Sequence, residues 1–510
     1  MTEQTTTPIN VLWFKRDLRL RDHPALATAI DGGLPLLLCF FYEPSLLKSP
    51  ESDKRHWRFV QQSLQDMQQM LAKYDASLYI FHAEVLPAFA KLNRHFQIKN
   101  IFSHQETGTK ITFDRDIAIR RFCRQNNIQW QEIPQDGIRR GAKNRIGWQQ
   151  GVQQALEAPP CEPDLPALHS VNLPEPLRQE LRGALLPEDF QVPNENFQPG
   201  GETFAWRYLQ GFVEQRARQY SRHLSKPSLS RKSCSRLSPY IAWGNLSVRQ
   251  IFQRIEPYKQ HRDLQFHLRN FQSRLWWRSH YIQKLESMWQ LEFEAINPAL
   301  RDLDRTLDER FEAWAGGRTG FPMVDASMRC LQATGWINFR MRAMLATFVT
   351  FTLWQDWRAA ALHLARLFTD FEPGIHYAQF QMQAGLTGYH PMRIFNPIIQ
   401  SERHDADGAF VRRWLPELHL VPAPQIYRPW RMTKMEQAFY QCTIGEDYPA
   451  PIVDYEEATR TAKAHYWQFR QRPEVQEALP DIWQRLCIPK DIERYRKQGY
   501  NTASEQEKRL

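Results

Sequence analysis

Apolar and polar positions alternate regularly over the first 135 residues. Short apolar runs predict buried strands at residues 10–14, 34–42, 77–82 and 100–103. Between them, apolar residues recur about every 3.6 positions and predict helices at residues 24–31, 53–73, 86–96 and 114–125. Strands that alternate with helices are typical of a parallel, doubly wound sheet with crossover helices.

The pattern changes twice further along the chain. Prolines cluster between residues 136 and 201, which predicts a surface linker with short helical pieces. From residue 202 to about residue 490 nearly every stretch has a helical period. We therefore expect an α/β domain at residues 8–135, an interdomain linker at 136–201, an all-α domain at 202–490 and a polar tail at 491–510.

Composition narrows the class of protein. A chain of 510 residues is too long for a single hydrophobic core. Its 42% hydrophobic and 24% charged residues are typical of a soluble globular protein and exclude a disordered one. The net charge of +10 favours a polyanionic partner, with nucleic acid first and an anionic membrane surface second. A basic surface that serves only solubility explains this charge equally well.

The seven cysteines are widely spaced and form no Cys-X-X-Cys pair. We therefore expect neither a zinc nor an iron–sulfur site, and a reduced, cytoplasmic compartment. The sequence opens without a signal-peptide pattern, and no apolar run is long enough to cross a bilayer. A cytoplasmic monomer without a membrane partner is the expected state.

Two short motifs indicate a cofactor site in the helical half. Tyr220 is followed by SCSRLSPYIAWGNLS at residues 233–247. Its Ser-Arg-Leu-Ser turn offers hydroxyl groups, backbone N–H groups and an arginine to a diphosphate, although a serine before a helix is commonly only a cap. RLWWRSHY at residues 274–281 combines basic and aromatic side chains, as in a binding wall or an ordinary amphipathic helix.

A third feature pairs bases with acids. Arg340 and Arg342 precede Asp370 and Glu372 by about one helix and one loop. An Arg–Asp pair beside a planar ligand would polarise it, and a purely structural ion pair is the alternative.

Longer motifs resemble the cryptochrome/photolyase family. They are VLWFKRDLRLRDHPAL at 11–26, GGRTGFPMVDASMRC at 316–330, GWINFRMR at 335–342, DFEPGIHY at 370–377 and RIFNPIIQSERHDADGAFVRRWLPEL at 393–418. The resemblance implies a non-covalent, U-shaped FAD inside the helical domain and a cavity above it that admits a flipped pyrimidine dimer. It also implies a possible antenna chromophore on the α/β domain. SHQETGTKITFDRD at 103–116 lies where the family contacts the antenna, and a folate type, a deazaflavin type and no antenna remain alternatives.

The resemblance assigns cofactor contacts residue by residue. In the family, Tyr220 and residues 234–238 would hold the phosphates and ribityl chain, and Arg342 with Asp370 would flank the isoalloxazine ring. The full set of expected cofactor contacts is Tyr220, Cys234, Ser235, Arg236, Leu237, Ser238, Phe271, Arg278, Phe339, Arg342, Asp370, Glu372 and His376.

His376 stands where the family places the residue that faces flavin N5, a position commonly filled by Asn, Asp or Cys. A neutral imidazole could donate to or accept from N5, and a protonated one would favour a negatively charged flavin. The alternative is a histidine turned aside to bond a helix-end carbonyl.

The expected substrate side departs further from the family. Dimer photolyases place Glu where Arg274 stands and Asn where Phe339 stands, while Ala343 replaces a Met and Met382 replaces a stacking Trp. The other stacking Trp is retained as Trp277. The expected substrate and DNA contacts are Arg274, Trp277, Arg340, Met382 and Arg393, and the basic groups suited to DNA phosphates are Arg231, Lys232, Arg340, Arg393 and Arg403.

Electron transfer is altered as well. In the family a chain of three tryptophans leads to the flavin; Trp357 fills one position, but the flavin-proximal one is Phe380. The resemblance therefore leaves three hypotheses: a blue-light-driven DNA repair enzyme, a cryptochrome-type photoreceptor, and a flavoprotein without photochemistry. Basic charge, and a sequence that ends without the long extension of many signalling cryptochromes, favour the first.

Overall fold

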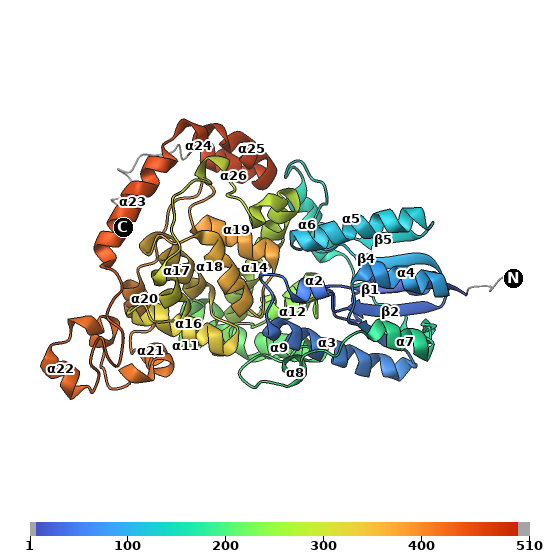
Figure 1. The fold of residues 1–510 in the computed structure, drawn as a ribbon, viewed down its shortest axis with the longest axis horizontal. Coiled ribbons are helices and arrows are strands. Elements are labelled where there is room, and N and C mark those ends of the chain that lie inside the picture. Colours follow the sequence, from blue (N-terminus) through green and yellow to red (C-terminus); the bar gives the residue numbers. More distant parts are fainter. Residues whose placement is uncertain (1–6, 498–510) are drawn as a thin grey trace.

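The structure is a computed structural model that describes residues 7–497; most of the polar tail expected at 491–510 lies outside the described residues. A parallel sheet occupies one end of the molecule and helices form the other (Figure 1). The strand order is β3-β2-β1-β4-β5, and every pairing is parallel. The strands are β1 (Pro8–Phe14), β2 (Leu36–Phe41), β3 (Leu78–Phe81), β4 (Gln97–His104) and β5 (Gln129–Ile133). The predicted fold class, a doubly wound α/β domain plus an all-α domain, is confirmed.

The central strands are apolar on both faces because helices cover both sides of the sheet. In β1, Ile9, Val11 and Trp13 pack into one hydrophobic cluster, while Leu12 and Phe14 pack into the other. β2 is buried along its whole length. The sequence analysis missed β5, whose QWQEI sequence is only half-buried at the edge of the sheet. Such a strand lacks the apolar run that revealed the others.

Helices accompany the sheet and the linker. Those within the α/β part are α1 (Pro24–Asp31), α2 (Pro44–Leu47), α3 (Lys54–Leu71), α4 (Val85–His95) and α5 (Lys110–Gln125). The linker forms α6 (Trp148–Glu157), α7 (Glu175–Arg182) and α8 (Glu188–Gln191). The four helices predicted within residues 24–125 are all present, displaced by a few residues at their ends.

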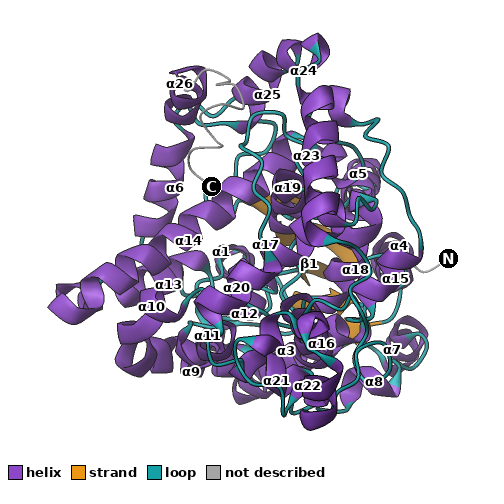
Figure 2. Cartoon of the chain, turned by 90° about the vertical axis from the view of Figure 1, so that its left-hand side faces the viewer, coloured by secondary structure: helices purple, strands orange, loops and turns teal. Residues whose placement is uncertain are grey.

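The helical region begins with α9 (Glu202–Gly211), and in the view of Figure 2 most of it lies in front of the strands. Its first half comprises α10 (Tyr220–His223), α11 (Pro227–Ser233), α12 (Ser238–Ala242), α13 (Val248–Ile255), α14 (Arg262–Ser287) and α15 (Glu309–Ala315). Next come α16 (Pro322–Thr334), α17 (Phe339–Thr347), α18 (Trp357–Leu367), α19 (Pro373–Gln383), α20 (Pro397–His404), α21 (Ala409–Trp414) and α22 (Lys434–Phe439). The last are α23 (Tyr455–Arg470), α24 (Pro473–Glu477), α25 (Leu479–Leu486) and α26 (Pro489–Lys497). No helix in residues 7–497 is both long and apolar enough to cross a membrane.

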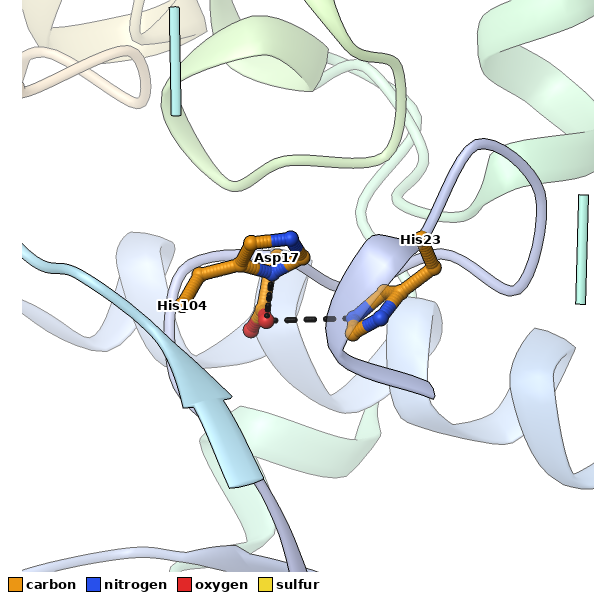
Figure 3. Close-up of side chains that lie close together, drawn as sticks. All are labelled: Asp17, His23 and His104. Carbon is orange, nitrogen blue, oxygen red and sulfur yellow. Dashed lines mark hydrogen bonds and ion pairs between the residues drawn. The ribbon is translucent and has the colours of Figure 1, made fainter. Parts of the chain in front are cut away.

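The loop that follows β1 is organised by a buried carboxylate (Figure 3). Oδ2 of Asp17 lies 3.1 Å from Nε2 of His23 and 2.7 Å from Nδ1 of His104, and Oδ1 accepts the backbone N–H of Lys15. These bonds hold the pKa of Asp17 well below its usual value despite its burial. Burial lowers the pKa of His104 to about 3, so that imidazole is neutral at physiological pH.

This loop joins the two domains. The backbone N–H of Leu18 donates to the Trp243 carbonyl at 3.1 Å, and Asn245 donates back to the Leu18 carbonyl at 2.8 Å. Glu202, at the start of α9, accepts from the backbone N–H of Leu20 and from Arg21. Backbone groups of this loop thus add hydrogen bonds to the hydrophobic cluster that already joins the two domains.

Replacing Asp17 by Asn tests this arrangement. The amide keeps one acceptor oxygen but points N–H groups at donors, so at least one buried donor loses its partner. We expect the free energy of unfolding to fall by about 3 kcal/mol, measured by urea denaturation. Asp31→Asn, an exposed change on α1, is the matched control and should have little effect. Equal stability of the two variants would contradict the role given to Asp17.

Candidate functional site

Two helices supply most of the side chains that the sequence analysis predicted to form the site. Phe271, Arg274, Trp277, Arg278 and Tyr281 recur every three or four residues along α14 and so share one side of it. α19 packs against α14. A Cβ atom on Gly374 would lie 2.6 Å from Cα of Ile282, so the close approach of the two helices requires glycine at this position.

An arginine–carboxylate pair lies between α17 and the loop before α19. Nη1 and Nη2 of Arg342 donate to the two oxygens of Asp370 at 3.0 and 2.8 Å, and Nε donates to the Ile337 carbonyl at 2.9 Å. The Asp370 side chain is 3% exposed and that of Arg342 is 25% exposed. The carboxylate is therefore fixed, while part of the guanidinium remains accessible for a ligand.

A second arginine is buried without an acidic partner. Arg236, with φ of 58°, is 8% exposed and donates twice to Oε1 of Gln198, at 3.0 and 2.7 Å. Its guanidinium lies 4.2 Å from the ring of Trp336, whose Nε1 donates to Oγ of Ser238. Burial lowers the pKa of Arg236 to about 10. Within residues 7–497 no carboxylate forms an ion pair with Arg236, so an anionic ligand would relieve the cost of burying it.

The aromatic side chains expected at the cofactor are packed among themselves. Tyr220 and Phe271 lie 5.7 Å apart and both contact Phe212. Arg274 is exposed on α14. Cys234, Ser235 and Leu237 are buried in the turn before α12, whereas Ser238 is half-buried. In this turn the Arg236 side chain bonds Gln198, and the Ser238 hydroxyl accepts from Trp336. Both side chains belong to the turn that the resemblance assigns to the FAD phosphates.

Arg278 and Glu372 bind each other. Arg278 donates to Glu372 at 2.6 and 3.2 Å and to Asp136 of the linker at 2.5 Å. Both carboxylates together raise the pKa of Arg278, although burial acts in the opposite direction. Arg278 is thus committed to a protein ion pair, and the sequence analysis did not foresee Asp136 as its partner.

His376 is neutral and its orientation is fixed. Nε2 lies 2.8 Å from the Ala361 carbonyl, which requires the proton on Nε2 and leaves Nδ1 as an acceptor. Burial lowers its pKa to about 4. The protonated form considered from the sequence is therefore absent at neutral pH, and the carbonyl that Nε2 bonds lies inside α18 rather than at a helix end. Phe380 lies 6.0 Å away, ring to ring.

The predicted substrate side presents flat and apolar groups. Trp277 is 45% exposed and stacks on Tyr281 at 5.9 Å, while the Tyr281 hydroxyl contacts Sδ of Met382 at 3.7 Å. Phe339 is 49% exposed at the start of α17, which makes it a surface group as well as an expected cofactor neighbour. Ala343 is buried one turn later, and Trp357 is half-buried at the start of α18.

A separate cleft of about 690 Å³, including space open to solvent, lies between the domains. Its walls include Trp13 and Arg16 at the end of β1, Thr109 and Arg115 after β4, and Phe371. β1 lies between β2 and β4: the chain adds β2 and β3 on one side of β1, and then β4 and β5 on the other side. The strand order therefore reverses at β1. Open parallel sheets bind ligands at the carboxyl ends of strands where the order reverses. Part of the 103–116 segment, predicted to contact an antenna, lines this cleft.

One group within residues 7–497 is compact enough to hold a metal ion, namely Asp17, His23 and His104. A metal-bound histidine normally donates its second ring N–H to an acceptor. Here Nδ1 of His23 instead accepts the backbone N–H of Leu26 at 3.0 Å, so Nε2 carries the proton that Asp17 accepts. The Asp17 carboxylate, both ring nitrogens of His23 and Nδ1 of His104 are therefore already used in hydrogen bonds, which leaves Nε2 of His104, and the cluster serves the loop (Figure 3).

Comparisons with known proteins agree with this geometry. The family model for the DNA photolyase domain matches residues 10–139, and that for the FAD binding domain of DNA photolyase matches residues 271–468. A deoxyribodipyrimidine photo-lyase from Alkalihalophilus pseudofirmus is 28% identical over 480 residues, which span 90% of this chain and 98% of the relative. The chain belongs to the cryptochrome/photolyase family.

Two solved structures share the fold of this family member. A cryptochrome from Synechocystis superposes with a TM-score of 0.81 at 24% identity, covering 90% of this chain and 99% of the cryptochrome. An archaeal photolyase from Sulfolobus tokodaii, solved with two FAD molecules, gives a TM-score of 0.73 at 24% identity and covers 90% of this chain and 99% of the photolyase.

The cofactor of this domain is FAD, and the side chains of the site fit it. Arg236 is a buried cation without an acidic partner, as a diphosphate requires, and Ser238 adds a hydroxyl. His376 and Met382 are half-buried on α19, and the guanidinium of Arg342 is partly exposed. Gln198, Trp336 and Asp136 complete these contacts and were missed from the sequence: Gln198 and Asp136 stand in no motif, and Trp336 lies within GWINFRMR without a cofactor role assigned to it.

Gly374→Ala tests the packing of α19 on α14. The added methyl group meets backbone atoms of Ile282, so the helix must move, which we expect to cost about 1–3 kcal/mol. Purified variant should melt at a lower temperature and retain less FAD, as measured by flavin absorbance per chain. Gly211→Ala is the control, because the nearest atoms to its Cβ are side-chain atoms of Arg216 at 4.0 Å. An unchanged FAD content in Gly374→Ala would refute the requirement.

Buried neutral histidines predict acid sensitivity. The pKa values of His56 and His376 are lowered by burial from 6.5 to about 4. The unfolded chain therefore takes up protons first as the pH falls, so stability that is present above pH 6.5 is lost between pH 6.5 and about 4. His56→Gln should remove about 2 kcal/mol of the difference between pH 7.5 and pH 5 in urea denaturation. His169→Gln, at an exposed position, should leave the pH dependence unchanged.

Proposed function

We propose that this protein is a blue-light-driven photolyase that binds DNA and acts on a pyrimidine photoproduct. FAD, when bound, supplies the light absorption and the electron that is transferred to the photoproduct. The chain binds the cofactor through Arg236, Ser238, Arg342 and Asp370, and it presents Trp277 and Met382 to the substrate. The proposed domain roles follow: residues 8–135 carry the antenna cleft, and residues 202–490 carry FAD and DNA.

A cluster of unpaired cations carries this proposal. Arg393 and Arg403 both lower the pKa of Arg340, after the larger effect of burial, so the three guanidinium groups lie close together. Arg340, Arg403 and Lys226 likewise lower the pKa of His404. In the described part of the chain none of these cations forms an ion pair with a carboxylate. Concentrated positive charge without acidic partners is what a phosphate backbone requires.

Not every predicted basic residue belongs to this cluster. Arg231 points inward, where Nη1 donates to the Thr334 hydroxyl and the Trp336 carbonyl, both at 3.0 Å. Arg340 contacts the ring of Phe395 and remains half-buried. The proposed phosphate contacts are therefore Arg340, Arg393, Arg403 and Lys226. Lys232, which directly follows Arg231, is exposed.

Substrate contacts follow from the shape and charge of the groups that surround Trp277. Its exposed indole offers a face on which a base can stack, and Tyr281 fixes the ring from behind. Arg274 is exposed one turn earlier on α14 and can donate to a pyrimidine carbonyl or to a phosphate. The neutral His376 accepts at Nδ1, and the Arg342–Asp370 pair fixes charge at the edge of the flavin.

The alternative is a cryptochrome-type blue-light photoreceptor without repair activity. The observation that favours it is the apolar character of Phe339 and Met382, which leaves Arg274 as the hydrogen-bond donor expected to reach a dimer. The two functions differ in one measurable outcome, which is whether light restores damaged DNA.

The interdomain cleft is proposed to hold an antenna chromophore. The Sulfolobus tokodaii photolyase carries a second FAD described as a light-harvesting cofactor. Trp13, Phe41, Trp57 and Phe371 provide apolar walls for a flat ring system. Ser52 and Thr109 provide hydroxyl groups for its polar edge.

Light-dependent repair decides between the two functions. FAD-loaded, photoreduced protein is illuminated with blue light in the presence of single- or double-stranded oligonucleotides that contain pyrimidine dimers or six-four photoproducts. We expect restoration of undamaged pyrimidines, measured by chromatography of the digested DNA. Absence of repair of both lesions in both forms of DNA would reject the photolyase and favour the photoreceptor. Arg274→Glu with Phe339→Asn would then show whether the scaffold can repair.

Salt dependence tests the cationic cluster. The double variant Arg340→Gln, Arg403→Gln removes two proposed phosphate contacts, so the slope of log affinity for duplex DNA against log salt should become shallower by about 1.8. Fluorescence anisotropy with a labelled duplex measures this slope. Arg178→Gln, on an exposed arginine of α7, should leave it unchanged. Identical slopes for both variants would mean that the charge serves only solubility.

A further inference from the structure

The segment 367–372, which precedes α19, is held at each of its six residues by a different side chain. Four of these side chains bind backbone carbonyls, and two bind the carboxylates of Asp370 and Glu372. The carbonyl contacts are Arg55 to Leu367 at 2.9 Å, His56 to Phe368 at 2.9 Å, Trp243 to Thr369 at 3.0 Å, and Arg16 to Phe371. The carboxylate contacts are Arg342 to Asp370 and Arg278 to Glu372.

These contacts come from both domains. Arg16 lies in the loop after β1, and Arg55 and His56 lie on α3, so the α/β domain holds backbone atoms of the segment. Arg342 on α17 and Arg278 on α14 hold its acidic side chains from within the helical domain. The two carboxylates expected at the flavin are therefore placed by the sheet domain as well as by their own ion-pair partners.

Arg16 has the central position in this arrangement. Its Nε donates to the Ala242 carbonyl at 3.0 Å, its Nη2 donates to the Phe371 carbonyl, and its guanidinium lies 4.3 Å from the ring of Trp243. In residues 7–497 Arg16 forms no ion pair with a carboxylate, so its bonds to carbonyls are what satisfies this half-buried cation. Arg16, His56 and Trp243 also form part of the wall of the interdomain cleft.

We propose that Arg16 is a positioning residue for FAD: from the cleft wall it holds the carbonyl that lies between Asp370 and Glu372 and thereby sets the place of both carboxylates. The inference rests on the proposed use of these carboxylates at the cofactor. Loss of the Arg16 bond frees the peptide between them, so both carboxylates lose a constraint that their ion pairs alone do not supply.

The experiment compares two half-buried arginines of the same cleft. Arg16→Gln removes the contact with segment 367–372. Arg115→Gln removes a guanidinium that binds Glu43, Glu106 and Asp116 and makes no contact with the segment. The full chain is loaded with FAD, and release of FAD is followed by the rise in flavin fluorescence after dilution. Circular dichroism of the bound flavin in the visible range reports its environment.

We expect Arg16→Gln to release FAD about tenfold faster than the wild type, with an altered visible circular dichroism spectrum. Arg16→Lys, which keeps one donor, should restore part of both properties. Arg115→Gln should release FAD at the wild-type rate even if it melts at a lower temperature, because its contacts lie within the α/β domain. Equal release rates and spectra for Arg16→Gln and Arg115→Gln would overturn the proposal.

A milder variant keeps the test decisive if Arg16→Gln does not fold. Trp243→Phe removes only the bond from Nε1 to the Thr369 carbonyl and keeps a ring beside Arg16. It should accelerate FAD release about threefold, and an unchanged rate would count against positioning by the segment. Wild-type protein that binds no FAD would instead overturn the proposed function itself, and this inference with it, whichever variant is examined.

Discussion

The buried charge of Asp17 is the interaction on which the arrangement of the two domains depends. An isolated carboxylate in a dry interface is too costly to bury, so it must be surrounded by donors. Two neutral imidazoles and a backbone N–H supply them, and the loop after β1 can then adopt only the path that brings these donors together. Along that path Leu18 and Leu20 meet the helical domain through backbone atoms, and Arg16 meets it through its guanidinium. One buried charge thus fixes the loop that carries Arg16, which lines the interdomain cleft and bonds segment 367–372.

Charge is used in two different ways in the helical domain. In the cofactor region, Arg342 and Arg278 are paired with carboxylates at hydrogen-bonding distance, which fixes geometry and leaves little net charge. Around Arg340 the cations have no carboxylate partner within residues 7–497 and repel one another, which costs stability and creates a field for polyanions. Arg236 lies between these cases, since it is buried, stacked on Trp336 and bonded only to neutral groups. The contrast separates residues that hold the site in shape from residues that await a negatively charged ligand.

Sequence periodicity was sufficient for the sheet because its inner strands are buried on both faces, as the apolar runs at residues 10–14 and 34–42 indicate. It failed for β5, whose polar residues pack at an edge. Resemblance placed Arg342 opposite Asp370, but it could not reveal that Arg278 binds Asp136, or that Gln198 bonds Arg236. Those partners come from the linker, where no period and no motif marks them. The state of His376 was also beyond the sequence, because it depends on a carbonyl of α18 that reaches Nε2.

Segment 367–372 is held mainly through its own backbone, and this has a consequence for how substitutions act. A carbonyl oxygen is present whatever side chain a residue carries, so changes at residues 367, 368, 369 and 371 leave the acceptors in place. The donors Arg16, Arg55, His56 and Trp243 have no such protection, because each bond exists only while that side chain does. Tolerance to mutation is therefore unequal on the two sides of the same contacts. The side chains at these four positions of the segment can therefore change, whereas the four donors cannot. Three of those donors, Arg16, Arg55 and His56, lie in the α/β domain.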